Sequence, residues 1–102
     1  SGLSEDEIKT IIADAESHKA TDEARRHMVE LKNAAEGLIY STERSLEEYG
    51  ASLDPDDAAL IQADLTKLQT ALEGNDPEEI DRLFKTLETS AYRIAETVYA
   101  QG

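Results

Sequence analysis

Apolar residues recur along the chain at spacings of three and four, which is the period of an amphipathic α-helix. Ser4 to Glu7 has the Ser-x-x-Glu sequence of a capping box, so we expect a helix from Glu5 to about residues 16–19. Its apolar stripe consists of Ile8, Ile11, Ile12 and Ala15. Thr21 is a candidate N-cap for the next helix, and the junction there is either a kink or a complete break.

A second helix is predicted from Asp22 to Tyr49, because the helical period continues without Pro throughout this range. Its stripe consists of Ala24, Met28, Leu31, Ala35, Leu38, Thr42, Ser45 and Tyr49. Gly50 follows the last of these positions, and we expect it to end the helix as a left-handed cap.

Two Asp-Pro pairs mark two further helix starts. Asp54 and Asp76 each stand where an N-cap is expected, and Pro55 and Pro77 take the first helical positions. Asp57 stands in the capping-box position after Asp54. We expect a helix from Pro55 to Glu73, and then one helix, or two with a small offset, almost to the last residue. Short loops between amphipathic helices predict an all-α fold, an antiparallel helical bundle.

The helix lengths predict that the N-terminal part projects from this bundle. At 1.5 Å per residue, the helix from Asp22 to Tyr49 is about 42 Å long, and the helix from Pro55 to Glu73 only about 28 Å. The bundle should therefore span residues 31–102, leaving residues 1–30 uncovered. The apolar positions of this part are Leu3, Ile8, Ile11, Ile12 and Met28. We call them the interaction stripe and expect a partner, a further domain or a second copy of the chain to cover it.

The composition excludes several classes of function. The chain has 102 residues, no Cys and a net charge of −13, so thiol chemistry is excluded and nucleic acid and anionic membranes are poor partners. Nine of its 23 acidic residues lie at predicted helix starts, where carboxylates stabilise the helix ends. No apolar run is long enough for a membrane span.

Candidate catalytic and metal-binding groups are few. His18 and His27 each lie four residues after an acid, and such a pair on a charged helix is typically a solvated surface pair. No third metal ligand, nucleophile–base pair or glycine-rich phosphate loop accompanies them. We therefore expect no catalytic site, no metal and no cofactor in this chain.

Gly37 is unusual because it lies inside a predicted helix, where Gly costs about 1 kcal/mol relative to Ala. Two interpretations are open. Either another helix packs closely at Gly37, which the sequence favours, or an outside element approaches here and meets Glu36 and Tyr40, which share a helix face.

Four segments together resemble a known family. They are Ser-Gly-Leu-Ser-Glu-Asp-Glu-Ile at 1–8, Asp-Ala-Glu at 14–16, Asn-Ala-Ala-Glu-Gly-Leu-Ile-Tyr-Ser-Thr at 33–42 and Ala-Leu-Glu-Gly-Asn-Asp at 71–76. In order and spacing they are similar to the C-terminal helical lid of the DnaK family, which are the bacterial seventy-kilodalton heat-shock chaperones. This lid is part of their substrate-binding domain. The resemblance covers essentially the whole chain.

The resemblance implies a chaperone lid that closes over a peptide-binding β-sandwich and slows the release of unfolded polypeptide clients. It implies ATP and magnesium in a nucleotide-binding domain outside this chain, a J-domain co-chaperone, a nucleotide exchange factor and a cytoplasmic location. Glu36 matches the acidic latch residue that pairs with a sandwich arginine. Tyr40 falls where some members carry His, and it can donate a hydrogen bond but cannot carry the imidazolium charge.

A second hypothesis is a free-standing acidic helical adaptor that binds a partner helix through the interaction stripe. An adaptor should bind its target as this isolated chain, whereas a lid alone should have no appreciable affinity for peptide. In isolation the stripe is also expected to drive association of two copies of the chain.

Overall fold

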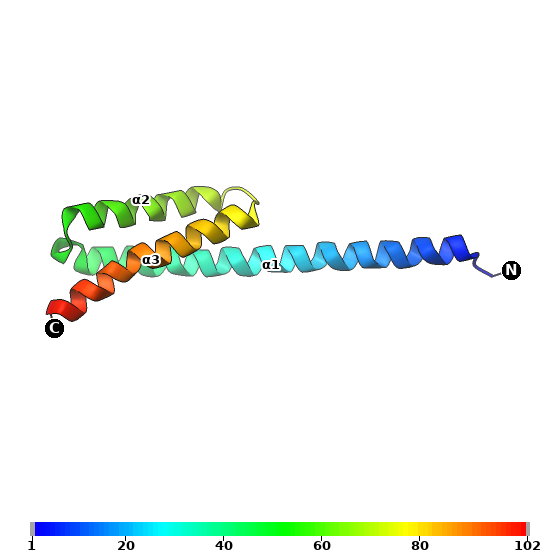
Figure 1. Cartoon of the computed structure of the whole chain (residues 1–102), viewed down its shortest axis with the longest axis horizontal. Coiled ribbons are helices and arrows are strands. Elements are labelled where there is room, and N and C mark those ends of the chain that lie inside the picture. Colours follow the sequence, from blue (N-terminus) through cyan, green and yellow to red (C-terminus); the bar gives the residue numbers. More distant parts are fainter. Residues whose placement is uncertain (1, 102) are drawn as a thin grey trace. The chain divides into compact units, whose positions relative to one another are not determined.

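The computed structural model describes residues 2–101, and they are helical with short connections (Figure 1). Three α-helices, α1 (Glu5–Tyr49), α2 (Pro55–Ala71) and α3 (Pro77–Gln101), are joined by a short 3-10 helix, η1 (Gly50–Ser52), and two loops. Within the described range there is no strand, which confirms the all-α prediction.

The chain divides into two compact units, one ending at Glu30 and the other beginning at Leu31. Helix α1 is continuous from one unit into the next, so the predicted N-cap at Thr21 is wrong. The Thr21 hydroxyl instead donates to the carbonyl of Ser17 (2.9 Å), a bond made inside a helix. Ser4 is the N-cap of α1 as expected, because the Glu7 N–H donates to the Ser4 Oγ (3.2 Å).

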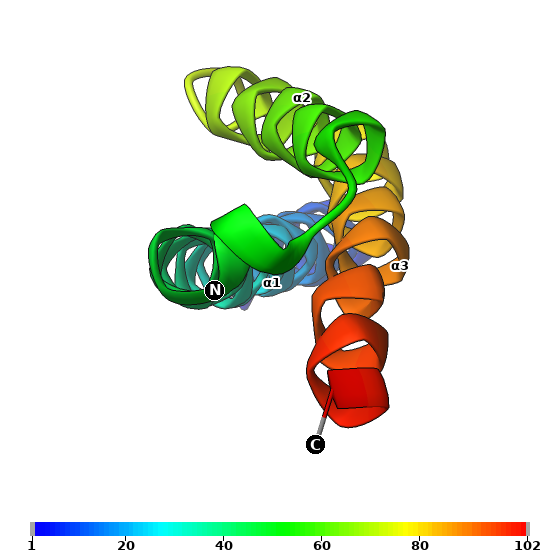
Figure 2. The same cartoon turned by 90° about the vertical axis from the view of Figure 1, so that its left-hand side faces the viewer.

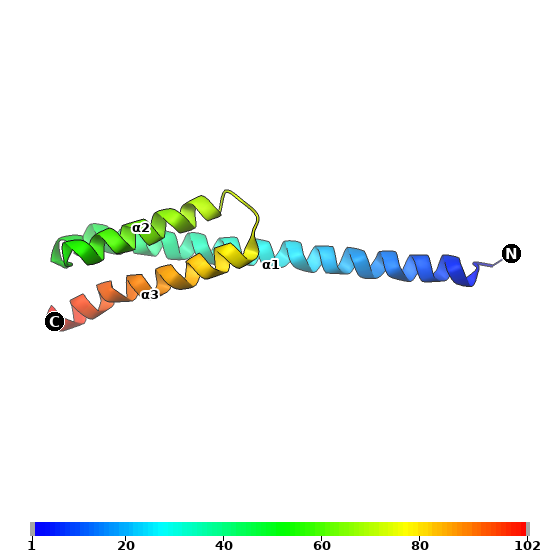
Figure 3. The same cartoon turned by 45° about the horizontal axis from the view of Figure 1, so that its top comes forward.

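The C-terminal unit is a three-helix antiparallel bundle. Figures 2 and 3 show α2 and α3 running alongside the C-terminal half of α1. Each helix contributes apolar side chains at helical spacing to one core. The buried apolar residues are Ala35, Ile39, Leu53, Ile61, Leu65, Leu68, Ile80, Leu83, Leu87 and Ile94. The last segment is one helix, which answers the question that the sequence left open.

Helix ends differ from the sequence expectation at three points. Gly50 does not adopt a left-handed conformation; it begins η1, and its carbonyl accepts from the Leu53 N–H (3.2 Å). Helix α2 ends at Ala71 rather than Glu73, because a turn closes from the Gly74 N–H to the Ala71 carbonyl (3.1 Å). Asp57, expected to help cap α2, instead forms an ion pair with Arg93 of α3.

Polar contacts hold the C-terminal half of α1 against the rest of its unit. The Lys32 ammonium donates to the Asn75 Oδ1 (2.9 Å), and the Gln69 amide donates to the Glu43 Oε1 (2.9 Å). These two bonds, about three helical turns apart on α1, fix the rotation of the helix together with the buried Ala35 and Ile39. These contacts determine which face of the C-terminal half of α1 points away from the bundle.

Candidate functional site

Glu36 and Tyr40 lie on the exposed face of α1 in the C-terminal unit. Because they are four residues apart, they occupy the same side of the helix. The buried residues of this segment, Ala35, Ile39 and Thr42, point into the bundle, while Glu36 and Tyr40 are exposed. The structure therefore brings the two predicted latch residues together and leaves both accessible to an outside group.

Arg44 is part of the same face, and the sequence reasoning missed it. Its guanidinium lies over the Tyr40 ring, 5.8 Å from the ring centroid, which is within the range of a cation–π interaction. Tyr40 as a whole residue remains 62% exposed despite this contact. The spacing of four residues between an aromatic and a basic residue was a readable signal for the pair.

Gly37 lies between Glu36 and Tyr40 in sequence and has no close neighbour. A Cβ atom built at this position meets no side chain or remote backbone atom within 4 Å. The interpretation that favoured close packing of another helix at Gly37 is therefore wrong. The absence of a side chain leaves the helix backbone open at this point of the exposed face.

The interaction stripe lies in the N-terminal unit and is largely solvent-exposed. The exposed fractions are 60% for Leu3, 44% for Ile8, 53% for Ile11 and 52% for Ile12, whereas Met28 is half-buried. Leu3, Thr10 and Ile11 line one shallow hollow near the start of α1. A single helix has no second element in its own unit against which to bury these side chains, so the stripe is available to a partner.

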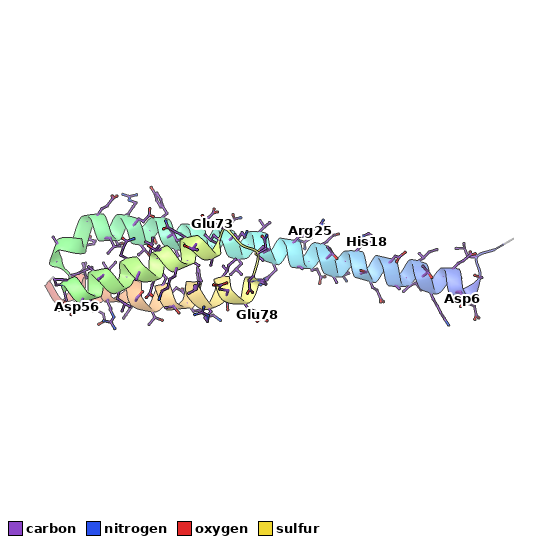
Figure 4. The ribbon with its side chains drawn as sticks, turned by 90° about the horizontal axis from the view of Figure 1, so that it is seen from above. Asp6, His18, Arg25, Asp56, Glu73 and Glu78 are labelled. Carbon is purple, nitrogen blue, oxygen red and sulfur yellow. The ribbon has the colours of Figure 1, made fainter. Side chains whose placement is uncertain are left out.

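Polar side chains flank the stripe along α1. Figure 4 shows the side chains of Asp6, His18 and Arg25 standing out from α1. Both His18 and His27 are exposed, and residues 2–101 contain no group of three or more His, Asp or Glu side chains placed to hold a metal ion. No helix among the described residues is long and apolar enough to cross a membrane.

Comparison with known families shows to which family the chain belongs. A family model described as Hsp70 protein matches residues 1–100. The match includes the interaction stripe as well as the face that carries Glu36 and Tyr40. The chain therefore belongs to the Hsp70 family of heat-shock chaperones.

Proposed function

We propose that this chain is the helical lid of the substrate-binding domain of a DnaK-like, ATP-dependent chaperone. In this proposal it closes over a peptide-binding β-sandwich of the same parent chain and slows the release of unfolded polypeptide clients. The lid acts by binding more tightly to one nucleotide-dependent arrangement of the sandwich than to the other. It has no catalytic site of its own.

The observation that carries the proposal is the exposure of the interaction stripe within a chain of the Hsp70 family. Leu3, Ile8, Ile11 and Ile12 each leave between 44% and 60% of their surface in water. Three large apolar side chains in the first turns of α1, with Leu3 just before the helix, form the kind of patch that marks a binding surface. A sandwich that covers this stripe would bury it when the lid closes.

Glu36 and Tyr40 support the latch part of the proposal. Both are exposed on a helix whose rotation is fixed by its own bundle, so they are presented to the sandwich without rearrangement of the lid. Glu36 offers a carboxylate to a basic group, and the Tyr40 hydroxyl offers one donor. The Arg44 guanidinium lies over the Tyr40 ring and adds a basic group to the same face.

The remaining roles belong to the parent chaperone. We propose that ATP and magnesium bind in its nucleotide-binding domain, and that a J-domain co-chaperone and a nucleotide exchange factor act there. A cytoplasmic location is part of the same proposal.

The latch is tested by Glu36→Ala in the reconstituted parent chaperone, with Glu47→Ala as the control. Glu47 is also an exposed acid on α1. Loss of one partly solvated charge pair of about 1 kcal/mol predicts roughly fivefold faster release of a fluorescent peptide in ADP. The control should release peptide at the wild-type rate. Unchanged kinetics in Glu36→Ala would exclude the latch role.

The lid role as a whole is tested by deleting this segment from the parent, which should accelerate peptide release more than Glu36→Ala does. The isolated chain separates a lid from an adaptor. A lid alone should not bind a client peptide measurably, whereas saturable binding of a partner helix by the isolated chain would favour the adaptor.

A further inference from the structure

A groove runs between α2 and α3 in the C-terminal unit, and the lid proposal does not use it. Its larger hollow has a volume of about 580 Å³, within the size range of small-ligand sites, and reaches from the middle of α2 to the α2–α3 loop. A second hollow continues it along the same two helices. Asp64 and Thr86 line both hollows, so the two form one continuous groove.

Asp64 is the unusual residue of this groove. It is a charged residue of which only 5% is exposed, placed among the core residues Ile61, Leu65 and Leu68 of α2. Among the described residues, none donates a hydrogen bond to its carboxylate, and the ion pairs formed are Asp81 with Lys85 and Asp57 with Arg93. No fully enclosed side-chain oxygen or nitrogen in residues 2–101 lacks a partner. The Asp64 oxygens must therefore be open to the groove.

A nearly buried carboxylate without a donor is costly to the fold, and such groups generally have a reason to be retained. Because most of Asp64 is shielded from solvent, solvent and salt screen a cation that reaches its carboxylate less than an ion bound at a fully exposed position. Asp76 and Glu79 line the same hollow, and the whole chain carries a charge of −13, which attracts cations.

Two basic residues, Lys67 and Arg82, also line the larger hollow. Both are exposed, so they remain hydrated and their long side chains can turn into solvent. The buried charge of the groove is thus negative and the exposed charges are mixed. This arrangement favours a ligand that inserts a cation and keeps its remaining polar groups at the rim. The apolar wall formed by Ala71 and Leu83 suits the methylene groups of a long basic side chain.

We propose that the α2–α3 groove binds an arginine side chain of a polypeptide partner, with its guanidinium against the Asp64 carboxylate. A planar guanidinium can donate two parallel hydrogen bonds to one carboxylate, and it is weakly hydrated, so it enters a partly buried site at a smaller cost than an ammonium. This groove is formed by α2 and α3, and the site therefore differs from the latch face of α1. The proposal does not rest on the lid function.

The test uses the 102-residue chain and two blocked pentapeptides, acetyl-Ala-Ala-Arg-Ala-Ala-amide and the same peptide with citrulline in place of arginine. Citrulline has the shape of arginine without its charge. Backbone amide shifts are followed by NMR during titration. The expected result is a saturable shift confined to amides along the groove, including Lys67 and Thr86, with the arginine peptide and at least tenfold weaker binding of the citrulline peptide.

Asp64→Asn is the test variant, and Glu47→Gln is the matched control, because it removes one unit of charge at an exposed position that lines neither hollow. Asp64→Asn should weaken binding of the arginine peptide at least tenfold, and its melting temperature should equal or exceed that of the parent chain. Glu47→Gln should bind the peptide as the parent does.

Three outcomes would overturn the proposal. The first is equal binding of the two peptides by the parent chain, and the second is absence of any saturable shift with the arginine peptide. The third is a marked fall in the melting temperature of Asp64→Asn with unchanged peptide affinity, which would give Asp64 a structural role instead. The comparison of the two peptides needs no variant, so it decides the question even if Asp64→Asn is poorly folded.

Discussion

Gly37→Ala should stabilise the isolated chain, because the glycine has no structural role within it. The residue lies inside the 45-residue helix α1, far from both helix ends, and its φ is not positive. An added Cβ would meet no side chain or remote backbone atom within 4 Å, so alanine introduces neither a clash nor a new buried contact. What remains is the difference in intrinsic helix propensity, which favours alanine.

The expected magnitude follows from that single term. Alanine is favoured over glycine in a helix interior by about 0.8–1.0 kcal/mol. For a domain of this size, each 1 kcal/mol raises the melting temperature by roughly 4–8 °C. Gly37→Ala should therefore shift the melting temperature upward by about 3–8 °C. Its urea midpoint should rise while the slope of the unfolding curve stays the same.

The matched control is the reverse substitution three residues earlier. Ala34 is exposed on the same helix, so Ala34→Gly should lower the stability by a similar amount for the same reason. Both variants are measured by urea unfolding followed by circular dichroism. A loss of stability in Gly37→Ala, or no change while Ala34→Gly behaves as expected, would show that another group packs at Gly37 and would refute the reasoning.

The same variant has a second readout in the parent chaperone. Gly37 lies between Glu36 and Tyr40 on the exposed face, and its bare backbone permits the close approach of an outside element. If the closed lid uses that approach, Gly37→Ala combines a more stable lid with faster peptide release in ADP. A more stable lid with unchanged release would mean that the docked element stays clear of this position.

Two further predictions concern the core and the stripe. Leu68 is fully buried, so Leu68→Ala should lower the free energy of unfolding in urea by about 3 kcal/mol. Leu60 is 42% exposed, so Leu60→Ala should lower it by less than about 1 kcal/mol. Similar losses in the two variants would contradict the assigned core. The isolated chain should associate at high concentration through the interaction stripe, while a chain beginning at Leu31 should remain monomeric. Light scattering measures the molar mass of both chains. If both are monomers at high concentration, the stripe is not an association surface.

Much of the fold was predictable because the helix signals are local. The two Asp-Pro pairs and the N-cap Ser4 place the helix starts correctly, since the Asp54, Asp76 and Ser4 side chains each accept from an N–H two or three residues away. The continuous α1 was not predictable in this way. Thr21 is a good N-cap residue, and only its bond to the Ser17 carbonyl shows that the helix continues through it.

The parts of the sites that depend on tertiary structure could not be predicted. Glu36 and Tyr40 were placed on one face correctly because the helical period determines it. The surroundings of Gly37 could not be read in this way, since only the tertiary structure shows that no other helix comes within 4 Å of a Cβ atom at this position. Asp64 lay three residues after Ile61 and one before Leu65, so its place near the core was visible in the pattern, but the absence of a donor was not.

The interaction stripe and the α2–α3 groove should bind chemically different partners. On the interaction stripe, apolar side chains such as Ile11 are exposed, and their burial gives a free-energy gain that is not directional and does not depend on charge. At Asp64, a charged side chain is nearly buried, and a cation with hydrogen-bond donors would compensate its charge. Binding at the groove should therefore weaken as salt screens the approach of the cation, whereas covering of the stripe should not. A single partner that used both surfaces would show both behaviours in one titration, so salt dependence distinguishes one shared partner from two separate ones.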